Sequence, residues 1–220
     1  MLLDLLFPRR CVFCRRLVSK GLNLCGICAE TLPFCQGTDA RQSGEFYSSC
    51  ISPLYYTDTV RDSHHRYKFQ GARWYANTYA PFVAQCITEH YAGRYDLITW
   101  VPLSRKRRRK RGYDQAELLA VAVSAELGIP NGRAGRSPLQ ATLCKTRDTA
   151  PLSSLGGKDE RKAQISEAYA VLDSAAIAEK RILLIDDVVT TGASLAECAR
   201  TLLMAGADEV LCATLARSEV

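Results

Sequence analysis

Short apolar runs alternate with longer segments of helical spacing along most of the chain. Runs rich in Ile, Leu and Val that are too short for a helix indicate strands buried on both faces. The predicted strands are residues 52–58, 95–101, 168–172, 181–185 and 209–215. The predicted helices are residues 73–91, 115–127 and 194–205. Strands separated by helices predict an α/β fold with a mainly parallel sheet flanked by helices.

Two breaks in this pattern limit the expected elements. Pro81 lies inside the segment 73–91, so we expect that helix to be kinked or divided. Residues 37–44 are polar and rich in Gly and Ser, which is typical of a linker. The sequence therefore predicts a small module, residues 1–36, followed by a larger domain, residues 37–220.

The predicted strand 181–185 leads directly into two carboxylates, Asp186 and Asp187. A loop of small residues and then a helix follow, and the loop residues are Thr190, Thr191, Gly192, Ala193 and Ser194. In an open α/β sheet, ligands bind outside the carboxyl ends of the strands. The backbone N–H groups of such a loop, together with the start of the helix, can hold a phosphate. Carboxylates beside a phosphate cradle predict a site for a sugar phosphate.

Four of the ten cysteines form two Cys-x-x-Cys pairs, Cys11 with Cys14 and Cys25 with Cys28. Each pair can place two thiolates on one side of a metal ion, and two pairs complete a tetrahedral site suited to Zn²⁺. A closed four-cysteine site has no open coordination position. The zinc would therefore be structural and would hold together a module too small to fold alone.

The other cysteines leave alternatives open. Cys35 or Cys50 could replace one of the zinc ligands or form part of a second site. The two pairs could also be unrelated thiols or a redox motif. Three further cysteines lie within apolar helix or strand patterns and are expected in the core: Cys86, Cys198 and Cys212.

Seven consecutive basic residues, 105–111, account for the positive charge of the chain. Of 29 basic residues, the 22 outside this run face 23 acidic ones. We interpret the run as a loop after the strand 95–101, where it would attract phosphate groups of nucleic acid or of a small ligand. No apolar segment is long enough to cross a bilayer, and residues 1–8 lack the charge order of a secretory signal. We therefore expect a cytoplasmic protein without membrane insertion.

The acidic pair and the loop after it resemble the motif with which type I phosphoribosyltransferases bind 5-phosphoribosyl-1-pyrophosphate (PRPP). Over nearly its whole length, the chain resembles the ComF/GntX-like branch of that family, in which a four-cysteine zinc ribbon precedes the transferase domain. The further matching residues are Val101-Pro102-Leu103, Arg111-Gly112-Tyr113-Asp114-Gln115-Ala116, Gln140, Arg147, Arg161 and Ala168-Tyr169. The chain departs from the family at Asp114 and Gln164, where the family commonly has Asn.

This resemblance implies a Rossmann-like type I phosphoribosyltransferase fold and a Mg²⁺-dependent enzyme. The enzyme would transfer the 5-phosphoribosyl group to a base or an amine and release pyrophosphate. Asp186 and Asp187 would hold the ribose hydroxyls, directly or through Mg²⁺, and residues 190–194 would hold the 5-phosphate. Arg111 and Gly112 would bind the pyrophosphate.

The resemblance also implies a lid and a set of partners. Lys145 and Arg147 would lie on a flexible lid, and Arg147 would join the acidic pair as a catalytic residue. ComF-like proteins are associated with DNA uptake during competence. The alternative function is therefore a non-catalytic module, gated by PRPP or a nucleotide, that binds single-stranded DNA and competence proteins. A homodimer is compatible with either function.

His64-His65 and the following Arg66-Tyr67-Lys68-Phe69 form one more segment with candidate chemistry. Paired histidines could bind a metal or titrate near neutral pH, and alternating basic and aromatic residues could stack on bases. We favour a structural interpretation, in which the rings point inward and the basic ends point outward.

Overall fold

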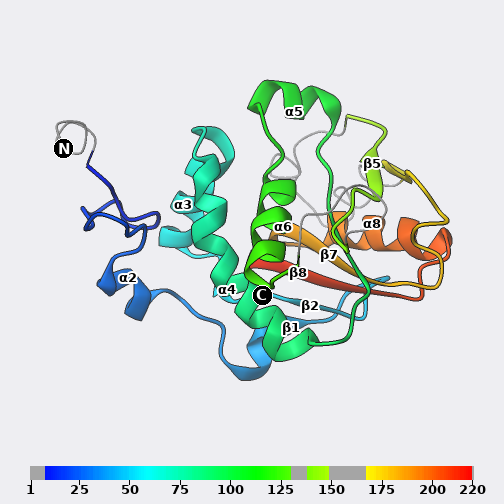
Figure 1. Cartoon of the computed structure of the whole chain (residues 1–220), viewed down its shortest axis with the longest axis horizontal. Coiled ribbons are helices and arrows are strands. Elements are labelled where there is room, and N and C mark those ends of the chain that lie inside the picture. Colours follow the sequence, from blue (N-terminus) through cyan, green and yellow to red (C-terminus); the bar gives the residue numbers. More distant parts are fainter. Residues whose placement is uncertain (1–7, 130–137, 149–166, 220) are drawn as a thin grey trace.

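The computed structural model describes residues 8–129, 138–148 and 167–219. In this part of the chain, a six-stranded sheet forms the centre of the larger domain (Figure 1). Its order is β1 (Arg41–Gln42), β2 (Ser49–Ile51), β8 (Glu209–Arg217), β7 (Arg181–Val189) and β4 (Leu97–Trp100), and β3 (Leu54–Tyr55) also pairs with β8. Every pairing in this sheet except that of β1 with β2 is parallel. The predicted mainly parallel sheet is therefore confirmed.

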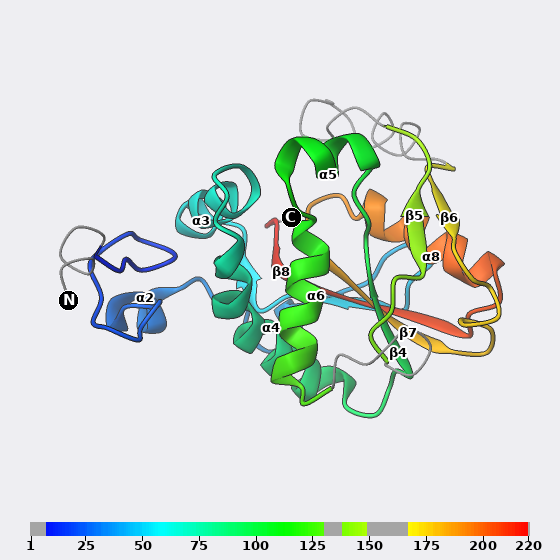
Figure 2. The ribbon, with the colours of Figure 1, turned by 45° about the horizontal axis from the view of Figure 1, so that its top comes forward.

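Helices cover both faces of the sheet (Figure 2). One face carries α3 (Asp58–Phe69), α4 (Ala76–Tyr91) and α6 (Gln115–Glu126), and the other carries α8 (Ala193–Met204). Alternation along β7 explains the two layers, because Leu183 and Ile185 join the first core whereas Ile182 and Leu184 join the second. The predicted helices 115–127 and 194–205 are confirmed with ends that differ by one residue.

The strand that carries the acidic pair is longer than predicted. We expected it to end at Ile185, but β7 continues to Val189. Its pairing with β8 extends to Val189 opposite Arg217, and this ladder keeps the backbone extended after the apolar residues end. Asp186 and Asp187 therefore lie within a strand rather than after it.

The segment predicted as strand 52–58 is only partly extended. β3 contains Leu54 and Tyr55, and the chain then turns into α3 at Asp58. The buried residues of α3 recur at helical spacing: Val60, Ser63, His64 and Tyr67. Three of these four are polar or amphipathic, so the helix had no clear apolar stripe in the sequence.

Pro81 does not divide the helix predicted over 73–91. A short 3-10 turn, η2 (Arg73–Tyr75), leads into α4, which continues through Pro81 to Tyr91. Proline removes a single N–H donor from the helix, whereas the buried face of α4 packs against the sheet and α6 along its whole length.

The basic run, expected as a loop, forms the short helix α5 (Arg105–Arg111). The Ser104 hydroxyl caps it by accepting the N–H of Arg107 at 3.3 Å, and Gly112 ends it with a φ of +82°. Arg and Lys have high helix propensity, and the positive charges in the last turn face the negative end of the helix.

The remaining elements are small. The predicted strand 168–172 is confirmed as β6 (Tyr169–Val171), which pairs antiparallel with β5 (Leu143–Lys145). The N-terminal module contains α2 (Gly26–Thr31), and η1 (Gly37–Ala40) leads from it into β1. Arg161 and Gln164 lie outside the described residues. None of the described helices is long and apolar enough to span a membrane.

Candidate functional site

The acidic pair lies at the carboxyl edge of the sheet, where the sequence predicted a ligand site. β4 pairs with β7 only as far as Trp100 and Ile185, whereas β7 continues along β8 to Val189. Asp186 and Asp187 therefore project beyond the end of β4. Because successive side chains of a strand point to opposite faces, the two carboxylates have different surroundings.

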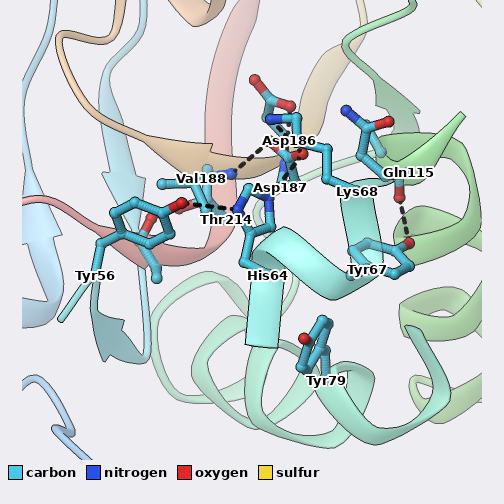
Figure 3. Close-up of polar contacts among 12 residues, drawn as sticks. Tyr56, His64, Tyr67, Lys68, Tyr79, Gln115, Asp186, Asp187, Val188 and Thr214 are labelled. Atoms are coloured by element: carbon cyan, nitrogen blue, oxygen red, sulfur yellow. Dashed lines mark hydrogen bonds and ion pairs between the residues drawn. The ribbon is translucent and has the colours of Figure 1, made fainter. Parts of the chain in front are cut away.

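Asp187 is buried and is held by two residues of α3 (Figure 3). Its Oδ2 lies 3.0 Å from Nε2 of His64 and 3.1 Å from Nζ of Lys68, and its Oδ1 accepts the N–H of Val188 at 2.9 Å. Burial alone would raise the pKa of this carboxyl. The Lys68 ammonium and His64 outweigh burial and hold the pKa well below its usual range. Asp187 is therefore ionised, with Lys68 as its counter-ion.

His64 is a neutral partner of this carboxylate. Its Nδ1 lies 3.0 Å from the hydroxyl of Tyr56. Burial lowers the pKa of the imidazole, although Asp187 acts in the opposite direction. We assign the tautomer in which Nε2 carries the proton toward Asp187 and Nδ1 accepts a hydrogen bond from Tyr56. Tyr56 thereby fixes the ring, and the ring in turn orients the carboxylate (Figure 3).

Sequence reasoning missed His64 and Lys68 as residues of this site. The prediction that rings point inward is right for His64 and Tyr67, which are buried, and wrong for His65 and Phe69, which are exposed. The prediction that basic ends point outward is wrong for Lys68, whose ammonium contacts Asp187. The available signal was the spacing of four between His64 and Lys68, which places both on one face of a helix. That signal becomes visible only when the segment is recognised as helical.

Asp186 points to the opposite face, which α8 covers. Its Oδ1 accepts the N–H of Asp187 at 2.8 Å. Burial, reinforced by the charge of Asp187, raises the pKa of Asp186 well above its usual range. On the same face, Nζ of Lys145 donates to the hydroxyl of Tyr169 at 3.2 Å, and burial lowers the pKa of Lys145 to about 8. The two carboxylates of the pair therefore differ in protonation and in partners.

The predicted phosphate loop, residues 190–194, connects β7 to α8. Gly192 has a φ of +73°, in the left-handed region that favours glycine, and immediately precedes α8. Among the residues that the structure describes, no side chain caps α8, so its first N–H groups have no side-chain acceptor there. A Cβ at Gly192 would lie 2.8 Å from the hydroxyl of Tyr47. The loop has the small residue and the open helix start that an anion site requires.

Arg111 is the last residue of α5, and Gly112 follows it before α6 begins at Gln115. The Arg111 guanidinium donates to Oε1 of Gln115, and its Cζ lies 5.0 Å from the centre of the Phe69 ring. The N–H of Gly112 donates to the carbonyl of Arg108 at 2.7 Å and completes the end of α5. The Gly112 amide that we expected to bind pyrophosphate is therefore already used within the protein, because the basic run is a helix.

Asp114, one of the departures from the family sequence, has a structural role. It is 2% exposed and caps α6, because its Oδ1 accepts the N–H of Ala116 at 3.1 Å and that of Glu117 at 3.4 Å. Its Oδ2 accepts the N–H of Leu103 at 2.7 Å. An Asn side chain has one acceptor oxygen and would turn its NH₂ group toward one of these donors. The carboxylate suits N–H donors on both sides better than the family's Asn.

A cavity of about 730 Å³ opens between α5 and the end of β5. Its lining residues are Ser104, Arg105, Lys106, Arg109, Cys144, Lys145, Thr146, Arg147 and Asp148. The volume is within the range of small-molecule sites, and five of the nine lining residues are Lys or Arg, which favours an anionic ligand. Of the predicted site residues, Lys145 and Arg147 line this cavity, whereas the acidic pair and Arg111 do not.

The four predicted zinc ligands come together at the N-terminus. The sulfurs of Cys11, Cys14, Cys25 and Cys28 all lie within 4.8 Å of one another, and those of Cys14 and Cys25 are 3.6 Å apart. Four sulfurs around a zinc ion with Zn–S bonds of about 2.3 Å would be separated by about 3.8 Å, so the cluster fits the ion. In the described residues, the cluster includes no fifth cysteine, and Cys50 is buried in β2.

Hydrogen bonds to sulfur favour the thiolate form of one of the four ligands, Cys11, whereas burial raises the pKa values of Cys14 and Cys28. Burial would raise the pKa of Cys11, but N–H groups of Cys14, Cys25 and Phe13 outweigh burial and lower it to about 7. Cys25 caps α2 by accepting the N–H of Cys28 at 3.4 Å. A thiolate is the form that binds zinc, so the module holds at least one ligand close to its binding form at neutral pH.

The zinc module contacts the same helix that holds Asp187. Oγ of Ser63 donates to the carbonyl of Val12 at 2.8 Å. Nη2 of Arg66 donates to the carbonyls of Val12 at 2.9 Å and Phe13 at 2.6 Å. Val12 and Phe13 lie between the first two cysteines of the cluster. The zinc loop is therefore connected to the acidic pair through one helix, α3.

Comparison with known proteins matches both parts of the chain. The double zinc ribbon domain family matches residues 2–47, and the phosphoribosyl transferase domain family matches residues 116–219. Competence protein F of Haemophilus influenzae is 27% identical over 96% of this chain and 98% of its own length.

Two further relatives have related names. Competence protein ComFC of Bacillus subtilis is 30% identical over 74% of this chain and 62% of its own length. DNA utilization protein YhgH of Salmonella typhimurium is 27% identical over 93% of this chain and 90% of its own. With a four-cysteine cluster ahead of a mainly parallel α/β domain, the chain belongs to the ComF-like family of phosphoribosyltransferase-domain proteins with an N-terminal zinc ribbon.

Proposed function

We propose that the protein binds PRPP and transfers its 5-phosphoribosyl group to a nitrogen nucleophile, with release of pyrophosphate. One observation carries this proposal: β7 extends the acidic pair beyond β4 and leads through Gly192 directly into the start of α8, which no side chain of the described part of the chain caps. Carboxylates suit the hydroxyls of ribose, and free N–H groups suit its 5-phosphate. The match of residues 116–219 to the phosphoribosyl transferase domain family supports the same substrate.

The two carboxylates would have different roles in binding ribose. Asp187 is already oriented by His64 and Lys68, so it is a rigid, charged acceptor. Lys68 has three donor hydrogens and a half-buried side chain, so it can donate to a ligand oxygen while it remains beside Asp187. The negative charge at this edge would stabilise the positive charge that develops on the ribose ring.

The cations around the cavity would receive the leaving group. As the C1–O bond breaks, its electron pair leaves with pyrophosphate, and the lone pair of the nucleophile forms the new C1–N bond. Lys145 and Arg147 line the cavity together with Arg105, Lys106 and Arg109, so positive charge is available for pyrophosphate. Arg111 would supply a further guanidinium from the other side of α5.

Mg²⁺ suits this edge because it prefers carboxylate and phosphate oxygens. Asp186 would hold it, since Oδ2 of Asp187 already contacts the Lys68 ammonium and His64. When bound, the ion would neutralise charge on the pyrophosphate and ribose oxygens. The raised pKa of Asp186 agrees with a carboxyl that awaits a cation.

Release of pyrophosphate tests this function. The purified protein would be incubated with PRPP and Mg²⁺, alone and with a panel of purine bases, pyrimidine bases and amines. We expect pyrophosphate release that depends on one acceptor class and is reduced at least a hundredfold in the Asp186→Asn variant, because positioning of ribose is lost. If PRPP binds but no pyrophosphate is released under any of these conditions, PRPP remains the proposed ligand and the proposed transfer is contradicted.

A second function is favoured by the exposed face of α5. Arg105, Lys106, Arg109 and Lys110 are all exposed on one short helix, next to the cationic cavity. Such a face suits the phosphates of a single strand, and PRPP or a nucleotide at the acidic pair would then act as an effector. The names of the relatives, which refer to competence and DNA utilization, support this alternative.

Salt dependence separates the two functions. We would measure binding of a labelled single-stranded oligonucleotide at increasing salt, for the natural chain and for a variant with Arg105, Lys106 and Arg109 replaced by Gln. The binding-module function predicts a steep loss of affinity with salt that is shallower in the variant. Oligonucleotide binding that is equal in both proteins would contradict it.

A further inference from the structure

The hydroxyl of Tyr47 lies against the loop before α8. Tyr47 comes two residues before β2, is 7% exposed, and packs in the core that α8 covers. Its hydroxyl oxygen lies 2.8 Å from the position that a Cβ of Gly192 would occupy. Gly192 immediately precedes the first residue of α8. A side chain far away in the sequence therefore reaches the predicted phosphate loop, and sequence reasoning did not include it in the site.

The backbone before β2 is shaped to bring the Tyr47 ring to this loop. Gly44 leaves the space that the tip of the ring fills, because a Cβ there would overlap its Cζ and its hydroxyl. Phe46 has a φ of +68°, in the left-handed region that a bulky residue rarely adopts. Such strain persists where the surrounding structure enforces it, and it is commonest at ligand sites. The turn therefore holds the Tyr47 hydroxyl between two glycines, Gly44 and Gly192.

Within the described part of the chain, the Tyr47 hydroxyl has no hydrogen-bond partner. Burial raises its pKa, so the phenol is protonated at neutral pH and can donate. A buried tyrosine hydroxyl normally has a partner, because an unpaired donor removed from water costs free energy. The fully buried Tyr91 follows this rule, since its hydroxyl pairs with Oγ of Ser49 at 2.7 Å. Tyr47 thus departs from the rule at the phosphate loop.

The unpaired hydroxyl and the start of α8 present donors in the same place. α8 is 12 residues long, and none of the described side chains caps its N-terminus. The positive end of such a helix and its unpaired N–H groups favour an anion. A phenol donor adds a charge-assisted hydrogen bond to a phosphate oxygen. The combination suits a ligand that has several acceptor oxygens and negative charge, which is the chemistry of a phosphate monoester.

We propose that Tyr47 is a ligand-binding residue that donates its hydroxyl hydrogen to a phosphate monoester held at the start of α8. This inference rests on the proposed function, because it adds a donor to the site proposed for the 5-phosphate of PRPP. The donor comes from outside residues 190–194, in the segment that connects the N-terminal module to β2. The bound phosphate would supply the partner that the hydroxyl does not have within the described protein.

Two substitutions that each remove one hydroxyl test this role. Tyr47→Phe keeps the ring between the two glycines and removes only the proposed donor. Tyr91→Phe is the matched control, because it removes a buried hydroxyl that is paired within the protein. The zinc-loaded natural chain and both variants would be titrated calorimetrically with PRPP and Mg²⁺ and with ribose 5-phosphate. Thermal unfolding of the three proteins without ligand would complete the set.

The two variants should show opposite effects. Tyr47→Phe should bind PRPP and ribose 5-phosphate about tenfold more weakly, because a hydrogen bond to a charged oxygen is lost. Its unfolding midpoint without ligand should be unchanged or higher, since an unpaired donor has been removed. Tyr91→Phe should bind both ligands normally and unfold about 2–4 °C lower.

Equal binding of both ligands by Tyr47→Phe and the natural chain would overturn the inference and leave the proposed function intact. A lower unfolding midpoint of unliganded Tyr47→Phe together with weaker binding would also overturn it, because the hydroxyl would then support the loop rather than the ligand. If the natural chain binds ribose 5-phosphate but not PRPP, the proposed function fails, and ribose 5-phosphate still tests Tyr47. If neither compound binds, both proposals fail.

Discussion

At the scale of single residues, Lys68 determines the charge state of the acidic pair. Two adjacent carboxylates at a half-buried strand end repel each other, and one of them is expected to take a proton. The ammonium of Lys68 at 3.1 Å and the imidazole of His64 at 3.0 Å keep Asp187 ionised. The charge of Asp187 then helps to raise the pKa of Asp186, so Asp186 is the carboxyl that takes the proton. A cation at Asp186 would remove that conflict.

Replacing Lys68 by Met should therefore destabilise the protein, because Asp187 loses its counter-ion while it stays buried. We expect a loss of about 1–2 kcal/mol in the free energy of unfolding, less than for a fully buried pair since Lys68 is partly exposed. Urea unfolding at pH 7 measures it. Arg61→Met, which breaks the exposed pair with Asp58, is the control and should change stability by less than about 0.5 kcal/mol. Equal effects would contradict this role of Lys68.

The ion pair between Asp96 and Arg181, outside the candidate site, predicts a stability that depends on pH. Arg181 donates two side-chain hydrogen bonds to the Asp96 carboxylate, at 2.7 and 3.0 Å, and these hold the pKa of Asp96 well below its usual range. Since the folded pKa lies below the unfolded value of about 3.9, the stabilisation is complete above that value and is lost as the pH falls below it.

Asp96→Asn should consequently be less stable than the natural chain at pH 7, by under about 1 kcal/mol because the pair is half-exposed. The difference should shrink as the pH is lowered from 5 to 3. Denaturant unfolding at pH 7, 5 and 3 measures it, and a difference that grows on acidification would contradict the assigned pKa direction.

At the scale of elements, the sequence was informative where burial is complete. The apolar runs of β4, β7 and β8 are typical of strands buried on both faces, and these strands were predicted close to their observed positions. Two helices without an apolar stripe, α3 and α5, were not predicted. The basic helix α5 depends on a cap from Ser104 and a left-handed Gly112, and α3 buries polar side chains. The acidic pair and the zinc ligands were found because their spacing is local, whereas His64 and Lys68 are more than 115 residues from Asp187.

A substitution at Gly112 tests whether the left-handed backbone conformation at the end of α5 requires glycine. An alanine there would adopt a φ of +82° and place its Cβ 2.8 Å from Nη2 of Arg73, which would disturb the hydrogen bond from Arg73 to the Gly112 carbonyl. Gly128 is the matched control, with a φ of +70° and no atom within 4 Å of the Cβ. We expect Gly128→Ala to cost about 1 kcal/mol and Gly112→Ala about 1 kcal/mol more, in thermal or urea unfolding. Equal costs would show that the contact with Arg73 contributes nothing.

At the scale of the whole molecule, the zinc module and the ligand site share α3. Ser63 and Arg66 on this helix bind the carbonyls of the loop between Cys11 and Cys14, and His64 and Lys68 bind Asp187. The ring of Phe13 from that loop also packs 5.7 Å from Tyr79 on α4. Because metal binding is coupled to the folding of small cysteine-rich modules, we expect zinc to order this loop and thereby to fix the position of α3.

We therefore expect removal of zinc by a chelator to weaken PRPP binding through α3, although none of the four zinc ligands lines the cavity. Arg66→Met should weaken PRPP binding several-fold while the protein keeps its zinc, since it releases α3 from the loop. Arg61→Met, on the exposed side of the same helix, should leave both unchanged. Calorimetry and a zinc assay on the same samples measure this. PRPP affinity that is independent of both zinc and Arg66 would contradict the coupling.

Calorimetric titration of the zinc-loaded protein with PRPP, with and without Mg²⁺, is the most direct test of the ligand site. The arrangement of the acidic pair and the loop before α8 predicts specific binding that strengthens with Mg²⁺ and is lost in the double variant Asp186→Asn, Asp187→Asn. Zinc content and circular dichroism would confirm that this variant remains folded. PRPP affinity equal in the variant and the natural chain, or no binding to the natural chain, would contradict the assignment of this strand end as the PRPP site.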